Sequence, residues 1–273
     1  MTMADRPYVV AHRGASAHRA EHTLAAYALA LDQGADGLEC DVRLTRDGHL
    51  VCVHDRTVNR TSDGRGVVSE LTLAAMAGLD YGGWHDELPE SADELMASPL
   101  ATPSAPVDHR GLLTLDALLG LVADVAPDTK LFVETKHPVR YGGRVEATLV
   151  ALLARHGLAK PPDKAESRVV VMSFSSLALR RVREQSPFLP TVLLIENSRR
   201  AVAGALAPWA DIAGPGIHLL RRDPGWVDRL RATGSDVYCW TVDRPADIAL
   251  CRDVGVRYLA TNAPAATRRV LAG

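Results

Sequence analysis

The stretch GLECDVRLTRDGHLVCVHD, residues 37–55, has the apolar density of buried strands but carries ionisable residues within them. Glu39 and Asp41 lie inside the first apolar run, and His54 ends the second. A carboxylate is costly to bury unless a cation or a hydrogen-bond donor pairs with it. These three residues therefore need partners that the rest of the chain must supply.

An Asp-Gly pair at positions 47–48 divides this stretch into two strand-like runs and predicts a β-hairpin. If these two residues form the turn, Asp41 lies opposite His54. Side chains two residues apart leave the same face of a strand, so Glu39 projects beside Asp41. We therefore expect the three ionisable side chains to converge.

Eight apolar runs that end in polar residues recur along the chain, and segments with helical periodicity separate most of them. The runs are YVVAHRG, GLECDV, KLFVETK, RVVVMSF, TVLLIEN, ADIAGPG, DVYCWTV and RYLATN. Near-continuous apolar strands that alternate with helices indicate a parallel sheet covered by helices. Eight such strands predict an α/β fold, a (β/α)8 TIM barrel formed by a single domain over residues 1–273. The run HLVCVH is then the antiparallel return of the hairpin after the second strand.

The helices have recognisable ends. Apolar residues from Leu24 to Leu31 repeat with helical spacing, and Gly34 is placed to end that helix. Thr114 is the expected N-cap of a later helix.

Between the hairpin and the third strand, about residues 55–112, we expect a small insertion subdomain over one end of the barrel, with a loop at roughly 90–110.

Composition excludes several classes of protein. The formal net charge of −2 favours neither nucleic acid nor an acidic membrane surface as a partner. No apolar run approaches the roughly 20 residues that span a bilayer, and the start of the chain has no signal-peptide pattern. The four cysteines lie in apolar contexts without metal-type spacing, so we expect buried free thiols and a cytoplasmic protein. Nothing in the sequence indicates an oligomeric state.

The active site of a parallel barrel lies at the carboxyl ends of its strands. The polar or aromatic residues at those ends are His12, Arg13, Glu39, Asp41, Glu134, Lys136 and Trp240. Three carboxylates brought together repel one another unless a cation lies between them. Oxygen ligands suit a hard divalent cation, either Mg²⁺ or Ca²⁺.

The remaining groups at these strand ends suit phosphate chemistry. Arg13 and Lys136 would hold a phosphate by their positive charge, while His12 and His54 could exchange protons near neutral pH. No Gly-rich nucleotide loop is present. The opposing interpretation is that the carboxylates form structural ion pairs with Arg13 and Lys136; five charged residues at the ends of three consecutive strands favour function. Trp240 is compatible with core packing or with ligand contact, and we expect most of the other histidines, among them His22, at the surface.

These residues resemble the glycerophosphodiester phosphodiesterase family, most closely its cytosolic actinobacterial members. The matching motifs are HRG at 12–14, GADGLECDVRLTRDGHLVCVHD at 34–55, RTSDGRG at 60–66, VETK at 133–136, SF at 173–174 and WTVD at 240–243. The resemblance implies a TIM barrel with an insertion after the hairpin. It also implies metal-dependent hydrolysis of a small-molecule glycerophosphodiester to sn-glycerol 3-phosphate and an alcohol.

The resemblance also implies a role for each site residue. The implied metal ligands are Glu39, Asp41 and Glu134, the acid–base pair is His12 and His54, the phosphate-binding residues are Arg13 and Lys136, and the pocket-lining residues are Phe174 and Trp240. The family usually has Pro-Glu-Asn-Thr after the first strand, where this chain has AEHT at 20–23. Glu21 is retained, and we expect it as an outer ligand or an orienting group. His22 replaces the asparagine and alters the contacts of that loop.

Other functions use parts of the same pattern. A hydrolase of lysolipids, similar to lysophospholipase D, would share the site but needs an apolar entrance, whereas Trp84, Leu88 and Met96 are scattered among acidic residues. A glycosidase needs carboxylates on opposite sides of a sugar, but Glu39 and Asp41 lie side by side. A non-catalytic metal- or phosphate-binding protein would bind its ligand without turnover.

Overall fold

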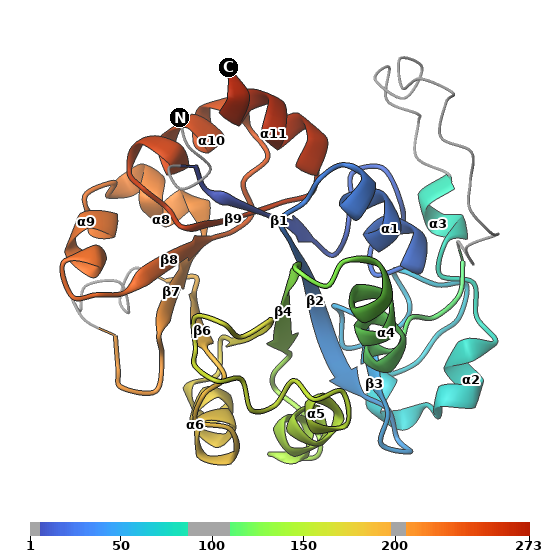
Figure 1. The fold of residues 1–273 in the computed structure, drawn as a ribbon. Helices are drawn as coiled ribbons and strands as arrows, with labels where there is room; N and C mark the ends of the chain where they lie inside the picture. The colour runs from blue at the N-terminus through green and yellow to red at the C-terminus, as the bar shows by residue number, and fades with distance from the viewer. Residues whose placement is uncertain (1–5, 87–109, 198–205) are drawn as a thin grey trace.

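Eight parallel strands close into a barrel in the computed structural model, which describes residues 6–86, 110–197 and 206–273 (Figure 1). The barrel closes because the first strand pairs with both the second strand and the last. In order round the barrel the strands are β1 (Tyr8–His12), β2 (Gly37–Leu44), β4 (Lys130–Thr135), β5 (Val169–Ser173), β6 (Thr191–Ile195), β7 (Ile212–Pro215), β8 (Asp236–Cys239) and β9 (Tyr258–Thr261). Each coincides with one of the eight predicted runs, so the predicted TIM barrel is confirmed.

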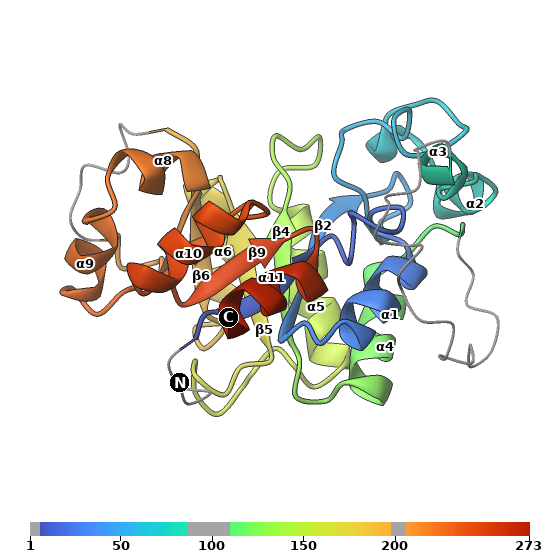
Figure 2. The same cartoon turned by 90° about the horizontal axis from the view of Figure 1, so that it is seen from above.

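Helices surround the barrel and connect its strands (Figures 1 and 2). The larger ones are α1 (Leu24–Asp32), α4 (Leu115–Val125), α5 (Arg144–Arg155), α6 (Ser176–Gln185), α8 (Ile217–Arg222), α9 (Trp226–Arg231), α10 (Pro245–Asp253) and α11 (Pro264–Ala272). Hydroxyl side chains of Thr23, Thr114 and Ser175 accept N–H bonds in the first turns of α1, α4 and α6. These bonds satisfy donors that a helix start leaves free, and they confirm Thr114 as an N-cap.

Strand alternation separates two apolar layers. Cys40 and Val42 of β2 point outward and pack with the helices, while residues such as Phe132 and Met172 fill the barrel interior. All four cysteines are free and buried, as predicted. Because Glu39 and Asp41 alternate with the outward residues, they point into the barrel, toward an interior that apolar residues partly fill.

The hairpin between β2 and β3 (Leu50–Cys52) has a different register from the one predicted. Thr45 N–H bonds to the His49 carbonyl, so three residues, 46–48, form the turn instead of two. Gly48 has φ +89°, which is the left-handed geometry of the common three-residue hairpin loop. Asp41 therefore bonds to Val53 N–H across the ladder, and the prediction that it lies opposite His54 is wrong.

The segment after the hairpin has its own small apolar cluster, which includes Val58, Val68, Met76 and Tyr81. Its helices are η1 (Val68–Glu70), α2 (Leu73–Ala77) and α3 (Gly83–Asp86), which lie to one side of the barrel (Figure 2). The predicted loop at 90–110 lies almost wholly outside the described residues, and the insertion boundaries 55–112 stay a prediction. None of the described helices has the length and apolarity to cross a membrane.

Candidate active site

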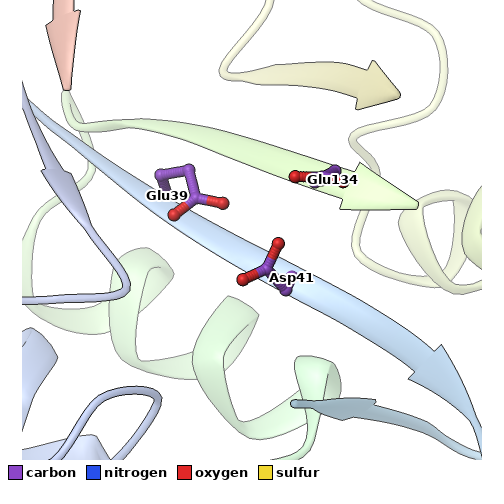
Figure 3. Close-up of side chains that lie close together, drawn as sticks. All are labelled: Glu39, Asp41 and Glu134. Atoms are coloured by element: carbon purple, nitrogen blue, oxygen red, sulfur yellow. The ribbon is translucent and has the colours of Figure 1, made fainter. Parts of the chain in front are cut away.

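Three buried carboxylates meet inside the barrel, two from the middle of β2 and one from near the carboxyl end of β4 (Figure 3). Asp41 pairs directly with Glu134 in the ladder between these strands, and Glu39 pairs with His12 of β1 in the same way. One oxygen from each carboxylate lies within 4.8 Å of the others, and the residues are 1–6% exposed. Ladder register therefore brings together the three predicted metal ligands and the first predicted histidine.

The two predicted phosphate-binding cations contact this cluster. Lys136 Nζ lies 2.9 Å from Glu134 Oε1 and 3.3 Å from Asp41 Oδ1, and Arg13 Nε lies 3.1 Å from Asp41 Oδ2. Arg13 has a left-handed backbone, φ +61°, which is costly for a residue with a side chain. In that conformation its own N–H donates to Glu39 Oε2 at 3.0 Å. Arg13 thus binds one carboxylate through its backbone and another through its guanidinium.

The carboxylates differ in charge state because their surroundings differ. Burial opposes ionisation of Asp41, but Lys136, His22 and Arg13 outweigh burial and hold its pKa well below the ordinary value. Burial and then the Asp41 charge raise the pKa of Glu39 well above its ordinary value, and the same two causes raise the pKa of Glu134 to about 8.

These shifts test whether a divalent cation fits. The positive side chains nearby stabilise the ionised form of Asp41. They do not offset the cost of ionising Glu39 and Glu134, whose pKa values stay raised. Oxygen donors that repel one another at this spacing are the donor set that Mg²⁺ or Ca²⁺ uses. The residues present therefore fit such an ion, and the purely structural ion-pair interpretation leaves two of the three carboxylates unexplained.

His12 is oriented by residues from the far end of the chain. Its Nδ1 lies 2.7 Å from Asn262 Oδ1. Asn262 donates to Asp243 through both its backbone N–H and its Nδ2, each at 2.7 Å. Because the Asn262 amide nitrogen is bound to a carboxylate, its oxygen must face His12, so Nδ1 of His12 donates and Nε2 is left for the pocket. Burial, and then the Arg13 charge, lower the pKa of His12 to about 3.

His54 reaches the same pocket by another route. Its Nδ1 donates to Asp55 Oδ1 at 2.7 Å, and its backbone oxygen accepts two bonds from the Arg43 guanidinium, at 3.0 and 2.8 Å. Arg43 belongs to β2, so its side chain holds the backbone of His54 beside that strand. His54 therefore reaches the site without being paired opposite Asp41. Burial lowers the pKa of His54 below its ordinary value.

A pocket of about 300 Å³ opens beside these groups. Its lining residues are His12, Arg13, Glu39, His54, Glu134, Lys136, Met172, Phe174, Leu194, Glu196, Tyr238 and Trp240. Every predicted site residue lines it except Asp41, which contacts the lining cations, and Glu21. A larger cavity of about 400 Å³ beside Tyr141 contains no histidine and one carboxylate, Glu70.

Glu21 and His22 lie on the loop between β1 and α1, and only His22 differs from expectation. Glu21 does not join the carboxylate cluster; it accepts bonds from Arg13 at 3.2 Å and from Arg60 at 2.7 and 2.9 Å, so it orients cations. His22 is buried, which contradicts its expected place at the surface: its Nε2 lies 2.9 Å from Asp41 Oδ2 and its Nδ1 2.8 Å from the Tyr27 hydroxyl.

The sequence reasoning missed three further groups. Glu196 lies in the predicted run TVLLIEN, directly after β6, and could have been found by the rule that found Glu134. Asn262 likewise ends the last run, directly after β9, but its partnership with His12 spans 250 positions. Tyr238 is buried at the base of the pocket, and its hydroxyl has no hydrogen-bond partner among the residues that the structure describes.

The arrangement suits one kind of chemistry. A cation-binding carboxylate cluster, two fixed positive charges and two histidines with available Nε2 atoms can neutralise a phosphate and move protons to and from its ester oxygens. The fold and the pocket define a TIM-barrel phosphodiesterase.

Comparison with known proteins gives the family. The profile of the "Glycerophosphoryl diester phosphodiesterase family" matches residues 12–266. The "Probable glycerophosphodiester phosphodiesterase 1" of Mycobacterium tuberculosis is 52% identical over 267 residues, which cover 97% of this chain and 93% of the relative. The glycerophosphodiester phosphodiesterase of Bacillus subtilis is 34% identical and covers 98% and 88%.

A solved structure supports the fold. The phosphodiesterase of Oleispira antarctica, determined in complex with the product sn-glycerol-3-phosphate, superposes with a TM-score of 0.78 at 22% identity and covers 99% of this chain and 98% of its own. The family match and the two sequence relatives extend over nearly the whole chain. The protein belongs to the glycerophosphoryl diester phosphodiesterase family.

Proposed function

We propose that this enzyme hydrolyses glycerophosphodiesters such as glycerophosphocholine and glycerophosphoethanolamine to sn-glycerol 3-phosphate and an alcohol, with one bound divalent cation, Mg²⁺ or Ca²⁺. The observation that carries the proposal is the convergence of Glu39, Asp41 and Glu134 in one cluster, which adjoins a pocket lined by both histidines. A cation held by these carboxylates would polarise a phosphoryl oxygen. Arg13 and Lys136 would bind the other phosphate oxygen by charge.

The partners of the two histidines support His12 as the general base and His54 as the general acid. His12 is hydrogen-bonded to a neutral amide and its pKa is about 3, so it is unprotonated at neutral pH and suits a general base. His54 donates to the Asp55 carboxylate, which favours the protonated imidazole against the burial that lowers its pKa, so His54 suits a general acid better than His12 does. His12 Nε2 would take a proton from the attacking oxygen while His54 Nε2 gives one to the leaving alcohol.

The attacking oxygen belongs either to water or to the 2-hydroxyl of the substrate. With the 2-hydroxyl, its oxygen bonds to phosphorus as the bond to the head-group alcohol breaks, and water then opens the cyclic phosphate. Trapping a cyclic glycerophosphate early in the reaction would identify the second route.

We also infer that the enzyme is cytoplasmic and acts on a small-molecule substrate. Four buried free thiols suit a reducing compartment. A lysolipid hydrolase remains the alternative function, and activity on a long-chain lysolipid measured against glycerophosphocholine separates the two. A non-catalytic binding protein would show saturable ligand binding without product.

The first test is release of sn-glycerol 3-phosphate from glycerophosphocholine in the presence of a chelator, and again after Mg²⁺ or Ca²⁺ is restored. We expect product to disappear with the chelator and to return with one of the cations. Glu39→Gln is the matched variant, because it keeps the size of the side chain and should remove the response to restored cation. Full activity in the chelator would contradict the metal requirement.

A further inference from the structure

We propose that the enzyme selects glycerophosphodiesters with a cationic head group, and that Glu196, with the aromatic wall of Phe174 and Trp240, recognises that charge. The inference rests on the proposed function and names the substrate class within it. It is carried by the distribution of charge round the pocket.

The pocket has two chemically distinct halves. Strands β1, β2 and β4 contribute the histidine, carboxylate and cation groups described above. Strands β5, β6 and β8 each contribute two lining residues, an inner one in the last part of the strand and an outer one directly after it. The two residues of each pair are two positions apart, so their side chains project from the same face. The inner residues, Met172, Leu194 and Tyr238, are buried, and the outer residues are Phe174, Glu196 and Trp240.

Glu196 is the one charged residue that this second half contributes to the pocket lining. It follows β6, which lies across the barrel from β1 and therefore from His12 and Arg13. Its backbone is fixed, because its carbonyl accepts a bond from His218 Nε2 at 3.0 Å and the preceding carbonyl accepts one from Gly216 N–H at 3.1 Å. Within residues 6–86, 110–197 and 206–273 its carboxylate has no ion-pair or hydrogen-bond partner.

The aromatic wall beside it is held rigidly. Trp240 Nε1 donates to the Gly214 carbonyl at 2.7 Å, and the backbone of Trp240 bonds to Pro215 and Ile217. The Phe174 ring meets the indole edge-on, with centroids 5.4 Å apart. Aromatic faces attract ammonium groups through cation–π contacts, and a nearby carboxylate adds a favourable charge interaction.

The direction of the substrate follows from these charges. The phosphate is attracted to Arg13 and Lys136, and a glycerol held near the carboxylate cluster leaves the other ester arm to extend toward the second half of the pocket. A choline or ethanolamine group there would meet Glu196 and Trp240. A neutral glycerol head group would gain neither the charge interaction nor the cation–π contact.

The test compares kcat/KM for glycerophosphocholine and for glycerophosphoglycerol, which has an uncharged head group, using the full-length protein with added cation. We expect the wild type to prefer glycerophosphocholine. Glu196→Gln, nearly isosteric, should lower kcat/KM for glycerophosphocholine about five-fold, the usual weight of one exposed charge contact. The change for glycerophosphoglycerol should stay below about two-fold, and Glu196→Lys should reverse the preference.

Glu184→Gln is the matched control, because it removes an equal charge from exposed surface on α6, outside the pocket lining. It should leave the ratio of the two kcat/KM values unchanged. Equal wild-type rates on both diesters, or an unchanged ratio in Glu196→Gln, would overturn the head-group inference while leaving the phosphodiesterase intact. No hydrolysis of either diester would overturn the proposed function itself, and the inference with it.

Discussion

Replacing Asn262 by alanine tests how the barrel prepares His12 for catalysis. The variant removes the oxygen that lies 2.7 Å from His12 Nδ1 and leaves every predicted metal ligand and cation in place. The net free energy of one such hydrogen bond is roughly 0.5–1.5 kcal/mol. At 1.36 kcal/mol for each factor of ten, we expect kcat to fall roughly 2- to 13-fold with little change in KM.

The assay is steady-state release of sn-glycerol 3-phosphate, and a double-mutant cycle sharpens it. His12→Ala should cost roughly 10²–10⁴ in rate, as expected for loss of a general base. If Asn262 acts only through His12, adding Asn262→Ala to His12→Ala should cause no further loss. Ser16→Ala is the matched control, since this hydroxyl bonds to the same Asn262 oxygen at 2.9 Å but to His12 at its backbone carbonyl, at 2.8 Å.

The reasoning would be refuted if Asn262→Ala lowered kcat as much in the His12→Ala background as in the wild type. Asn262 would then act on kcat independently of His12. A rise in KM without a fall in kcat would refute it as well.

Three further predictions follow from the site. His54→Ala should lower kcat roughly 10²–10⁴-fold, and near-wild-type turnover would contradict its role as the general acid. His22→Ala should lower the free energy of unfolding by roughly 1–3 kcal/mol, because it removes a partner from buried Asp41; urea denaturation in chelator measures this, and unchanged stability would show that the contact is dispensable. Arg60 and Arg13 outweigh burial and lower the pKa of Glu21 to about 2, so the stability that Glu21 contributes is complete above its unfolded pKa of about 4.3 and is lost as pH falls toward 2. Glu21→Gln should therefore flatten the dependence of unfolding free energy on pH between about 2 and 4.3, and an unchanged slope would contradict the ion pairs.

The sequence was sufficient to predict the barrel and the carboxylate cluster, because both follow from short-range periodicity. Eight apolar runs give eight strands, and a two-residue period places Glu39 beside Asp41 and Glu134 on the same face as Lys136. Parallel strands that close into a barrel bring their carboxyl ends to one rim, so the ends of distant runs had to meet there.

Other features depended on geometry that local patterns do not encode. The hairpin register shifted by one residue because Gly48 takes a left-handed conformation in a three-residue turn, and a residue pair alone does not distinguish that turn from the two-residue form. His22 is buried because the left-handed loop that contains it folds back onto Asp41.

By itself the sequence determined the fold, the strand ends and the residue types that they carry, because strand periodicity and chain order are local properties. Only the tertiary structure decided which of these groups share a pocket and in what state of charge. The contact of His12 with Asn262 requires the barrel to close between β1 and β9, and the raised pKa values of Glu39 and Glu134 require burial next to Asp41. Hydrogen bonding and desolvation between distant segments exist only once the barrel has formed.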